Sequence, residues 1–310
     1  MRRIYFLICM FLYFSVEGRI QIRQTGSSTV YPFAMKVAQE FSKKPTKICP
    51  LVESTRTGNG FRDFTQNTFG CDVVGASTVI TPQEVDSCKK LGIQSLLEIC
   101  IGMDGIALAI KKNLKGFDNL KLVEIFQAIA LKVPNQKGEM VENPYKKWSD
   151  INPSYPDIPI RILIPSKSRG TRDTFETVVM QGHDIRNGQE VREISDYEAA
   201  DSHDLLFDYL KNNDKTMAFV ADSLLSSHQD HIKSLTIDSM EPTILNIQNG
   251  TYPITRKLFI YVNEDRYKTT EGLREYVNEW LSPEAIGKDG YLTKMGLVPL
   301  FASEKKQRKL

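Results

Sequence analysis

A short polar turn that carries two arginines precedes a helical pattern; its residues are Arg169, Gly170, Thr171 and Arg172. Thr171 occupies the position of an N-cap, which leaves backbone N–H groups at the helix start pointing outward. The positive end of the helix and the planar guanidinium of Arg172 both favour an oxyanion there. An ordinary capped helix with solvent-facing arginines explains the same residues, so this turn alone leaves both interpretations open.

Two further turns of serine, threonine and glycine also precede helical patterns. One ends with Ser28 and Thr29, and the other begins at Thr57 and continues as Gly-Asn-Gly over residues 58–60. Each turn offers hydroxyls and backbone N–H groups at a positive helix end, and glycine lets a ligand approach the backbone closely. Capping explains any one of these turns. Three in one chain indicate a site that surrounds a small tetrahedral anion.

A site made only of hydrogen-bond donors would accept sulfate as readily as phosphate. Phosphate keeps a proton at neutral pH, so one acidic acceptor can bind that proton and repel sulfate. Asp104, which lies between Met103 and Gly105, is our candidate for this acceptor. A turn formed by the Asp-Gly pair is the alternative interpretation.

The sequence shows no motif for catalysis or metal binding. Its 4 histidines all lie between residues 183 and 231, without metal-ligand spacing. It contains neither a Gly-x-Ser-x-Gly elbow nor a Walker-type phosphate loop. We therefore predict a protein that is not an enzyme and has no catalytic residues, metal or cofactor. A secreted phosphatase or hydrolase would need a nucleophile–base pair or a set of metal ligands.

Each of the three turns follows a predicted strand. The sequence alternates strand, small polar turn and helix, which favours an α/β sheet with ligand-binding loops at the strand ends. Apolar stretches at residues 98–110 and 258–262 flank a region with its own strand–helix alternation.

This pattern predicts two lobes, between which the chain crosses near residues 103–106 and again near 245–257. A ligand cleft between the lobes is the expected arrangement. The predicted division is lobe 1 from residues 19–103 and 250–302, lobe 2 from 104–249, and a disordered basic tail from 303–310.

Residues 1–18 are typical of a secretory signal peptide. Arg2 and Arg3 precede an apolar run from Ile4 to Phe14, which is too short to span a bilayer as a helix. We expect cleavage near Gly18 and a mature protein outside the cytoplasm, and an N-terminal anchor or a buried strand is the alternative. The formal net charge of +2 gives no field that would recruit nucleic acid.

Four cysteines follow the signal peptide: Cys49, Cys71, Cys88 and Cys100. An even number suits a disulfide-forming compartment, and sequence alone leaves the pairing open. Cys71 with Cys88 is our first choice, because the two residues flank one short segment. Reduced, buried cysteines are the alternative.

Taken in order, these motifs resemble the periplasmic phosphate-binding proteins of phosphate ABC importers, the PstS type. The resemblance covers nearly the whole chain after the signal peptide. Its carriers are residues 26–32, 57–61, 75–77, 104–105, 170–175 and 252–256.

The resemblance implies a type II periplasmic-binding-protein fold, which is an α/β fold of two lobes with a ligand cleft, joined by two crossing segments. It implies inorganic phosphate as ligand, permease subunits of a phosphate ABC importer as membrane partners, and a periplasmic location. We expect a monomer. Carried over by position, the donors would be Ser28, Thr29, Thr57 and Thr171 beside Gly170, with Arg172 as the charged contact and Asp104 as the acceptor of the phosphate proton.

Two positions depart from the family pattern. Arg169 stands where relatives usually carry serine, so a long cation replaces a hydroxyl donor. Thr78 follows Ala76 and Ser77 where relatives often carry arginine or aspartate, so an ionic contact is lost. These differences leave open another oxyanion or an acidic metabolite as ligand. A role in phosphate sensing is a separate alternative.

Overall fold

The structure is a computed structural model, and it describes residues 22–45, 48–66, 71–164, 176–180, 203–222, 225, 228–301 and 307–309. The predicted signal peptide and the turn from Arg169 to Arg172 lie outside the described residues. Within the described part of the chain, no helix is both long enough and apolar enough to cross a membrane.

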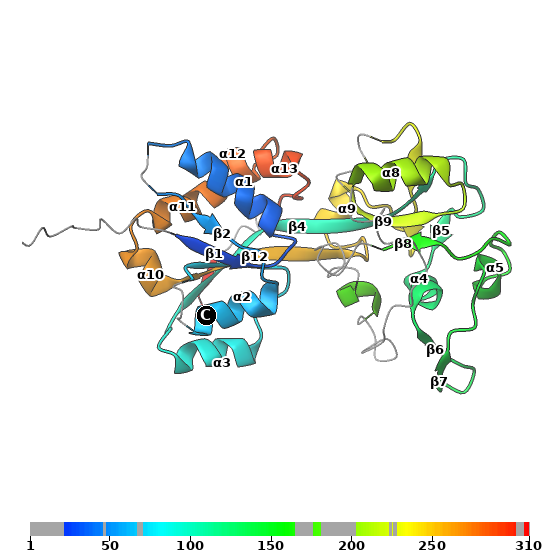
Figure 1. Cartoon of the computed structure of the whole chain (residues 1–310), viewed down its shortest axis with the longest axis horizontal. Coiled ribbons are helices and arrows are strands. Elements are labelled where there is room, and N and C mark those ends of the chain that lie inside the picture. The colour runs from blue at the N-terminus through cyan, green and yellow to red at the C-terminus, as the bar shows by residue number, and fades with distance from the viewer. Residues whose placement is uncertain are drawn as a thin grey trace, which may run out of the picture.

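Two α/β lobes lie end to end along the long axis of the molecule (Figure 1). Two long strands join them, β4 (Leu96–Lys111) and β12 (Thr255–Asn263). The two strands pair antiparallel, from Thr255 opposite Gly105 to Asn263 opposite Leu96. The α/β class and the two-lobe architecture that the sequence predicted are therefore confirmed.

The first lobe has a mixed sheet with strand order β2-β1-β3-β12-β4, in which β1 is parallel to both β2 and β3. Its own strands are β1 (Arg23–Gly26), β2 (Leu51–Val52) and β3 (Val73–Ala76). Figure 1 shows helices above and below this sheet. Those above include α1 (Tyr31–Ser42), α11 (Leu273–Trp280), α12 (Pro283–Ile286) and α13 (Tyr291–Lys294), and those below are α2 (Thr57–Gln66) and α3 (Pro82–Lys90), with α10 (Glu264–Thr269) at the end of the lobe.

Helix α1 shows how the sequence forms this lobe. Its buried side chains recur at helical spacing and face the sheet: Phe33, Ala34, Val37, Ala38 and Phe41. Phe41 packs edge-on against Tyr276 of α11, with 5.4 Å between the ring centroids. Burial of a large apolar side chain contributes about 1.5–3 kcal/mol. The apolar stripe therefore holds α1, and with it the turn that precedes α1, against β1.

The second lobe extends the sheet through the far half of β4. β9 (Met217–Ala221) and β10 (Ile232–Ser234) pair antiparallel with β4, and β8 (Ile162–Leu163) is parallel to β9. Two small two-stranded sheets lie outside it, β5 (Asn119–Leu120) with β11 (Thr236–Ile237) and β6 (Lys132–Pro134) with β7 (Met140–Glu142). Its helical segments among the described residues are α4 (Leu122–Ile129), α5 (Trp148–Ile151), the π-helix η1 (Glu176–Met180), α8 (His203–Asn212) and α9 (Ile244–Gln248).

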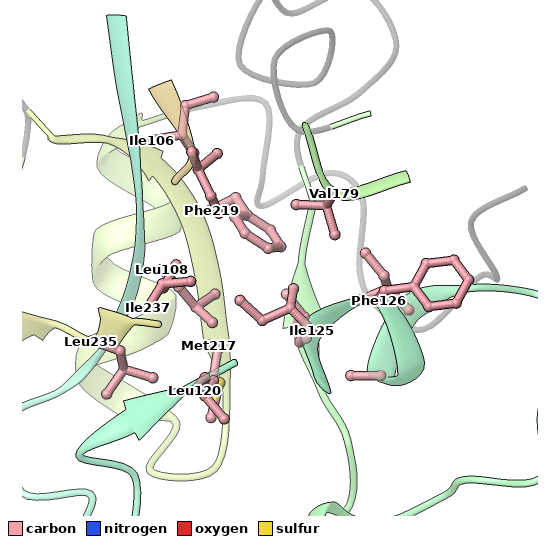
Figure 2. Close-up of a cluster of buried hydrophobic side chains, with 14 of the residues drawn as sticks. Ile106, Leu108, Leu120, Ile125, Phe126, Val179, Met217, Phe219, Leu235 and Ile237 are labelled. Carbon is pink, nitrogen blue, oxygen red and sulfur yellow. The ribbon is translucent and has the colours of Figure 1, made fainter. Parts of the chain in front are cut away.

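The largest core cluster of this lobe lies between the sheet and α4 (Figure 2). Strands β4 and β9 contribute Ile106, Leu108 and Phe219, and Val179 of η1 packs into the same cluster. The sequence predicted a helical pattern after the turn at residues 169–172. Its described end is the π-helix at Glu176–Met180, anchored in the core by Val179 and Met180.

The C-terminal segment forms a further link between the lobes. Val298 and Met103 exchange backbone hydrogen bonds of 2.8 and 2.9 Å. Leu297 belongs to the core of the first lobe, whereas Val298 and Leu300 pack in the core of the second. The sequence assigned residues 297–300 to the first lobe. They lie at the junction because backbone pairing with β4 carries them along the crossing strand.

The basic tail is not disordered over its whole length. Residues Gln307–Lys309 form β13, which pairs antiparallel with Leu97, Glu98 and Ile99 of β4. This prediction was wrong for these three residues. Strand pairing uses backbone groups, so an open edge of β4 accepts a polar segment that charge patterning marks as solvated.

The predicted disulfide between Cys71 and Cys88 is not formed; both are free thiols, as are Cys49 and Cys100. The Cys71 Sγ donates to the Val73 carbonyl oxygen at 3.3 Å and lies 3.3 Å from the Thr25 hydroxyl. Its sulfur is therefore engaged by β1 and β3 rather than by Cys88 on α3. Burial raises the pKa of Cys71 and of Cys88 to about 11, so both thiols stay protonated at neutral pH.

A cavity of about 720 Å³ lies at the junction and is lined by both lobes, including Lys294 of α13 and Thr243 before α9. Gly105 of β4 and Asp222, directly after β9, also line it. A side chain on Gly105 would point at Ile247 of α9. Since successive strand residues face opposite ways, this cavity and the Asp104 side chain are on opposite faces of β4.

Asp222 makes the stability of the protein pH-dependent. Burial raises its pKa from 3.8 to about 6, so between these values the folded chain keeps a proton that the unfolded chain releases. The free energy of unfolding therefore falls as the pH rises from about 4 to about 6. Asp222→Asn should be more stable than the wild type by about 2 kcal/mol at pH 8 and nearly equal to it at pH 3.5. Urea unfolding at both pH values measures this; an equal difference at both would contradict it.

Candidate functional site

Two of the predicted turns meet at the ends of β1 and β3. The Ser27 N–H donates to the Gly75 carbonyl oxygen at 2.8 Å, and the Gly26 N–H donates to the Thr55 hydroxyl at 3.1 Å. The Thr55 N–H in turn donates to the Gly26 carbonyl oxygen at 2.9 Å. These bonds hold the start of α1 and the start of α2 beside each other.

Glycines allow the two turns to approach this closely. Gly26 has φ +124°, and a Cβ on it would lie 2.1 Å from the Gly75 carbonyl oxygen. A Cβ on Gly60 of α2 would lie 2.7 Å from the Gly26 Cα. Both contacts are with backbone atoms, which cannot swing aside as a side chain can. The first turn of α2 therefore lies directly against the end of β1.

The turn before α1 presents Ser28 and Thr29. The Thr29 N–H donates to the Ser27 hydroxyl at 3.2 Å, and the Tyr31 N–H donates to the Ser27 carbonyl oxygen at 2.9 Å. Ser27 therefore closes the turn, and it does so from a fully buried position. Ser28 is half-buried and Thr29 is buried.

The other predicted turn places Thr57 as the first residue of α2. Its hydroxyl accepts from the Ser77 N–H at 3.3 Å and lies 3.2 Å from the Ser77 hydroxyl. Ser77 follows β3 and is buried, whereas the neighbouring Thr78 is exposed. Ser77 was not among the predicted site residues, although its position just after a buried strand was the available signal.

Asp104 lies on the crossing strand β4, not in a turn. The turn interpretation is therefore wrong, and the reason is that residues 103–105 pair along their whole length with β12. The residue opposite Asp104 is Arg256, and the Thr255 hydroxyl donates to the Asp104 carbonyl oxygen at 3.0 Å. Asp104 is held where the two lobes join.

Arg256 is the residue that sequence reasoning missed. Its Nη2 donates to the Thr29 hydroxyl and lies 4.0 Å from Oδ2 of Asp104. The side chains of Arg256 and Asp104 are only 8% and 12% exposed. Its motif, residues 252–256, was part of the family resemblance, but a single arginine before an apolar strand carries no signal by itself. The pairing of β4 with β12 is what brings it to Thr29.

The structure thus brings together Thr29 and Asp104 through Arg256, and Ser28 lies in the same turn as Thr29. Thr57 lies on the adjacent helix start. Arg169, Gly170, Thr171 and Arg172 lie outside the described residues. The described residues on either side of them, Ile164 and Met180, belong to the core of the second lobe.

Chemically, the described part of the site combines hydroxyls, two helix starts, a buried guanidinium and the carboxylate of Asp104. This set suits a small oxyanion, because every member except Asp104 can donate a hydrogen bond. No cluster of histidine, cysteine, aspartate or glutamate that could hold a metal occurs among the described residues.

Comparison with known proteins identifies the family. The family model described as the PBP superfamily domain matches residues 15–284. The chain belongs to the PBP superfamily. The two-lobe fold with crossing strands is the architecture of this superfamily, as the sequence motifs implied.

Similar proteins align with most of the chain. Protein SphX of Synechococcus elongatus is 27% identical over 292 residues, which is 92% of this chain and 79% of SphX. The phosphate-binding protein PstS of Staphylococcus epidermidis is 29% identical over 264 residues, 84% of this chain and 74% of PstS. The crystal structure of a possible phosphate binding protein from Planctomyces limnophilus superposes with a TM-score of 0.74 at 25% identity, covering 92% of this chain and 94% of that one.

The glycine contacts that form this PBP-superfamily site lead to a stability prediction. Gly26→Ala should lower the free energy of unfolding by about 3 kcal/mol or more, because of its positive φ and the clash with Gly75. Urea unfolding measures this. Gly58→Ala is the control and should not lower the free energy of unfolding. Its added Cβ would meet nothing within 4 Å, and alanine favours helix over glycine by about 1 kcal/mol. Wild-type stability in Gly26→Ala would show that the close approach is absent.

Proposed function

We propose that this protein captures inorganic phosphate between its two lobes and delivers it to the permease subunits of an ABC importer. The observation that carries the proposal is the grouping of Thr29, Asp104 and Arg256 where the lobes join. The names of the SphX, PstS and Planctomyces relatives support phosphate as the ligand.

The proposed ligand set has one half on each lobe. Ser28, Thr29 and Thr57 would donate from the helix starts of the first lobe. Gly170, Thr171 and Arg172, with Arg169 beside them, would donate from the segment that follows β8 in the sequence. Asp104 would accept the proton of the phosphate. Binding from both sides would favour a closed arrangement of the lobes.

The cellular role follows from the same proposal. Removal of residues 1–18 would release a monomer into the periplasm, where it would hand phosphate to its permease without chemical change. Membership of a family of binding proteins supports a function without catalysis. The alternative roles are binding of another oxyanion or an acidic metabolite, which Arg169 and Thr78 favour, and phosphate sensing.

Calorimetry on the chain from residue 19 tests the ligand. We expect heat from phosphate at micromolar concentrations and none from equal sulfate. Arg172→Ala should weaken phosphate binding by more than about 2 kcal/mol, about thirtyfold in Kd, because it removes a charge-assisted hydrogen bond. No heat from phosphate at tens of micromolar would refute the proposal. An unchanged Kd in Arg172→Ala would place that residue outside the site.

The proposed role of Asp104 has its own test. An amide can donate to sulfate where a carboxylate repels it, so Asp104→Asn should lower the ratio of the sulfate Kd to the phosphate Kd by about tenfold or more. Asp222→Asn is the matched control, because Asp222 lines the cavity on the opposite face of β4 and should leave the ratio unchanged. An unaltered ratio in Asp104→Asn would show that another group discriminates the two anions.

A further inference from the structure

Arg256 occupies a position that links three parts of the molecule. It lies on the crossing strand β12, it is paired in register with Asp104 of β4, and it donates to Thr29 in the turn before α1. A buried arginine of this kind is costly unless its charge is compensated. Two of its contacts are with residues predicted to bind the ligand.

The contact with Thr29 fixes the direction of a hydroxyl proton. A guanidinium can only donate, so the Thr29 oxygen must be the acceptor of the bond from Nη2. The proton of Thr29 is then left to be donated to another acceptor. Arg256 thereby commits the Thr29 hydroxyl to donation, which is what an oxyanion needs.

The contact with Asp104 has a different character. At 4.0 Å, the Nη2 to Oδ2 separation is that of an ion pair rather than a direct hydrogen bond. The guanidinium favours the charged form of the nearby carboxylate, and with both side chains largely buried, water screens their interaction little. A carboxylate can accept the proton of phosphate, whereas a protonated Asp104 could donate to sulfate as well.

We propose that Arg256 is a positioning residue that determines the selectivity of the site for phosphate over sulfate by keeping Asp104 an acceptor, while its bond to Thr29 keeps that hydroxyl a donor to either anion. This inference rests on the proposed phosphate function. It assigns the discrimination to a pair of residues on the two crossing strands, so the selectivity is built into the junction of the lobes.

Calorimetric titration of phosphate and sulfate into wild type, Arg256→Gln and Arg256→Lys tests the proposal. Arg256→Gln should lower the ratio of the sulfate Kd to the phosphate Kd by about tenfold or more, because the compensating charge is lost. Arg256→Lys keeps the charge without the fork, so it should bind both anions more weakly but keep the ratio within about threefold of wild type.

Arg266→Gln is the matched control. Arg266 of α10 also pairs with a buried aspartate, Asp72, but it lies beyond the end of β12 that is away from the crossing. Its loss should lower stability and leave the ratio unchanged. Thr29→Val keeps Arg256 and removes only the hydroxyl, so it should weaken both anions alike.

The outcomes separate this inference from the proposed function. A wild-type protein that does not bind phosphate overturns both. Phosphate binding by the wild type with an unchanged ratio in Arg256→Gln overturns the role of Arg256 alone. If Arg256→Gln does not fold, the other two variants decide. A fall of about tenfold or more in the ratio of the sulfate Kd to the phosphate Kd in Arg256→Lys overturns the role of Arg256. A fall of that ratio in Thr29→Val as large as the one expected for Asp104→Asn overturns it as well.

Discussion

The antiparallel pairing of β4 with β12 is the interaction on which the rest of the molecule depends. β4 is 16 residues long and contributes to the sheets of both lobes, and β12 pairs with it across the junction. The register shifts by one residue between Leu258 and Phe259, where β4 carries a bulge. A bulge bends a strand and increases its twist. The part of the ladder that holds Asp104 therefore runs in a different direction from the part inside the first lobe.

This pairing decides which polar groups face each other. Register places Arg256 opposite Asp104, and the packing of α1 on the first sheet brings Thr29 to the same point. A slip of one residue would turn Arg256 to the opposite face of the sheet, where the cavity and α9 lie. The chemistry of the site is therefore only as well defined as the register of two strands.

The glycine contacts set a second constraint. Gly26 and Gly60 let the end of β1 and the first turn of α2 touch through their backbones, so two helix starts converge without intervening side chains.

The C-terminal segment adds a link between the lobes beside β4, through Met103 and Val298. Three segments thus meet at the junction: β4, β12 and the C-terminal segment. All three would have to bend in any movement of one lobe against the other.

The sequence by itself determined the fold class and the two-lobe architecture. These follow from local patterns, namely apolar runs of strand length, helical spacing as in α1, and turns rich in serine and glycine, and such patterns act within a few residues. It also singled out Thr29 and Asp104. Sequence could not exclude a turn at Asp104, because an Asp-Gly pair is equally compatible with a turn and a strand until its partner is known.

Tertiary structure alone decided what those residues contact. Arg256 lies 227 residues from Thr29 along the chain, and no local pattern connects them. Tertiary structure also decided that the Cys71 sulfur contacts Thr25 rather than Cys88. It decided as well that the tail forms strand β13, because β4 has an open edge there. Contacts of this kind arise from strand register and from packing between distant segments. The polar groups can therefore be identified in the sequence, but the residues that they contact are determined only by the tertiary structure.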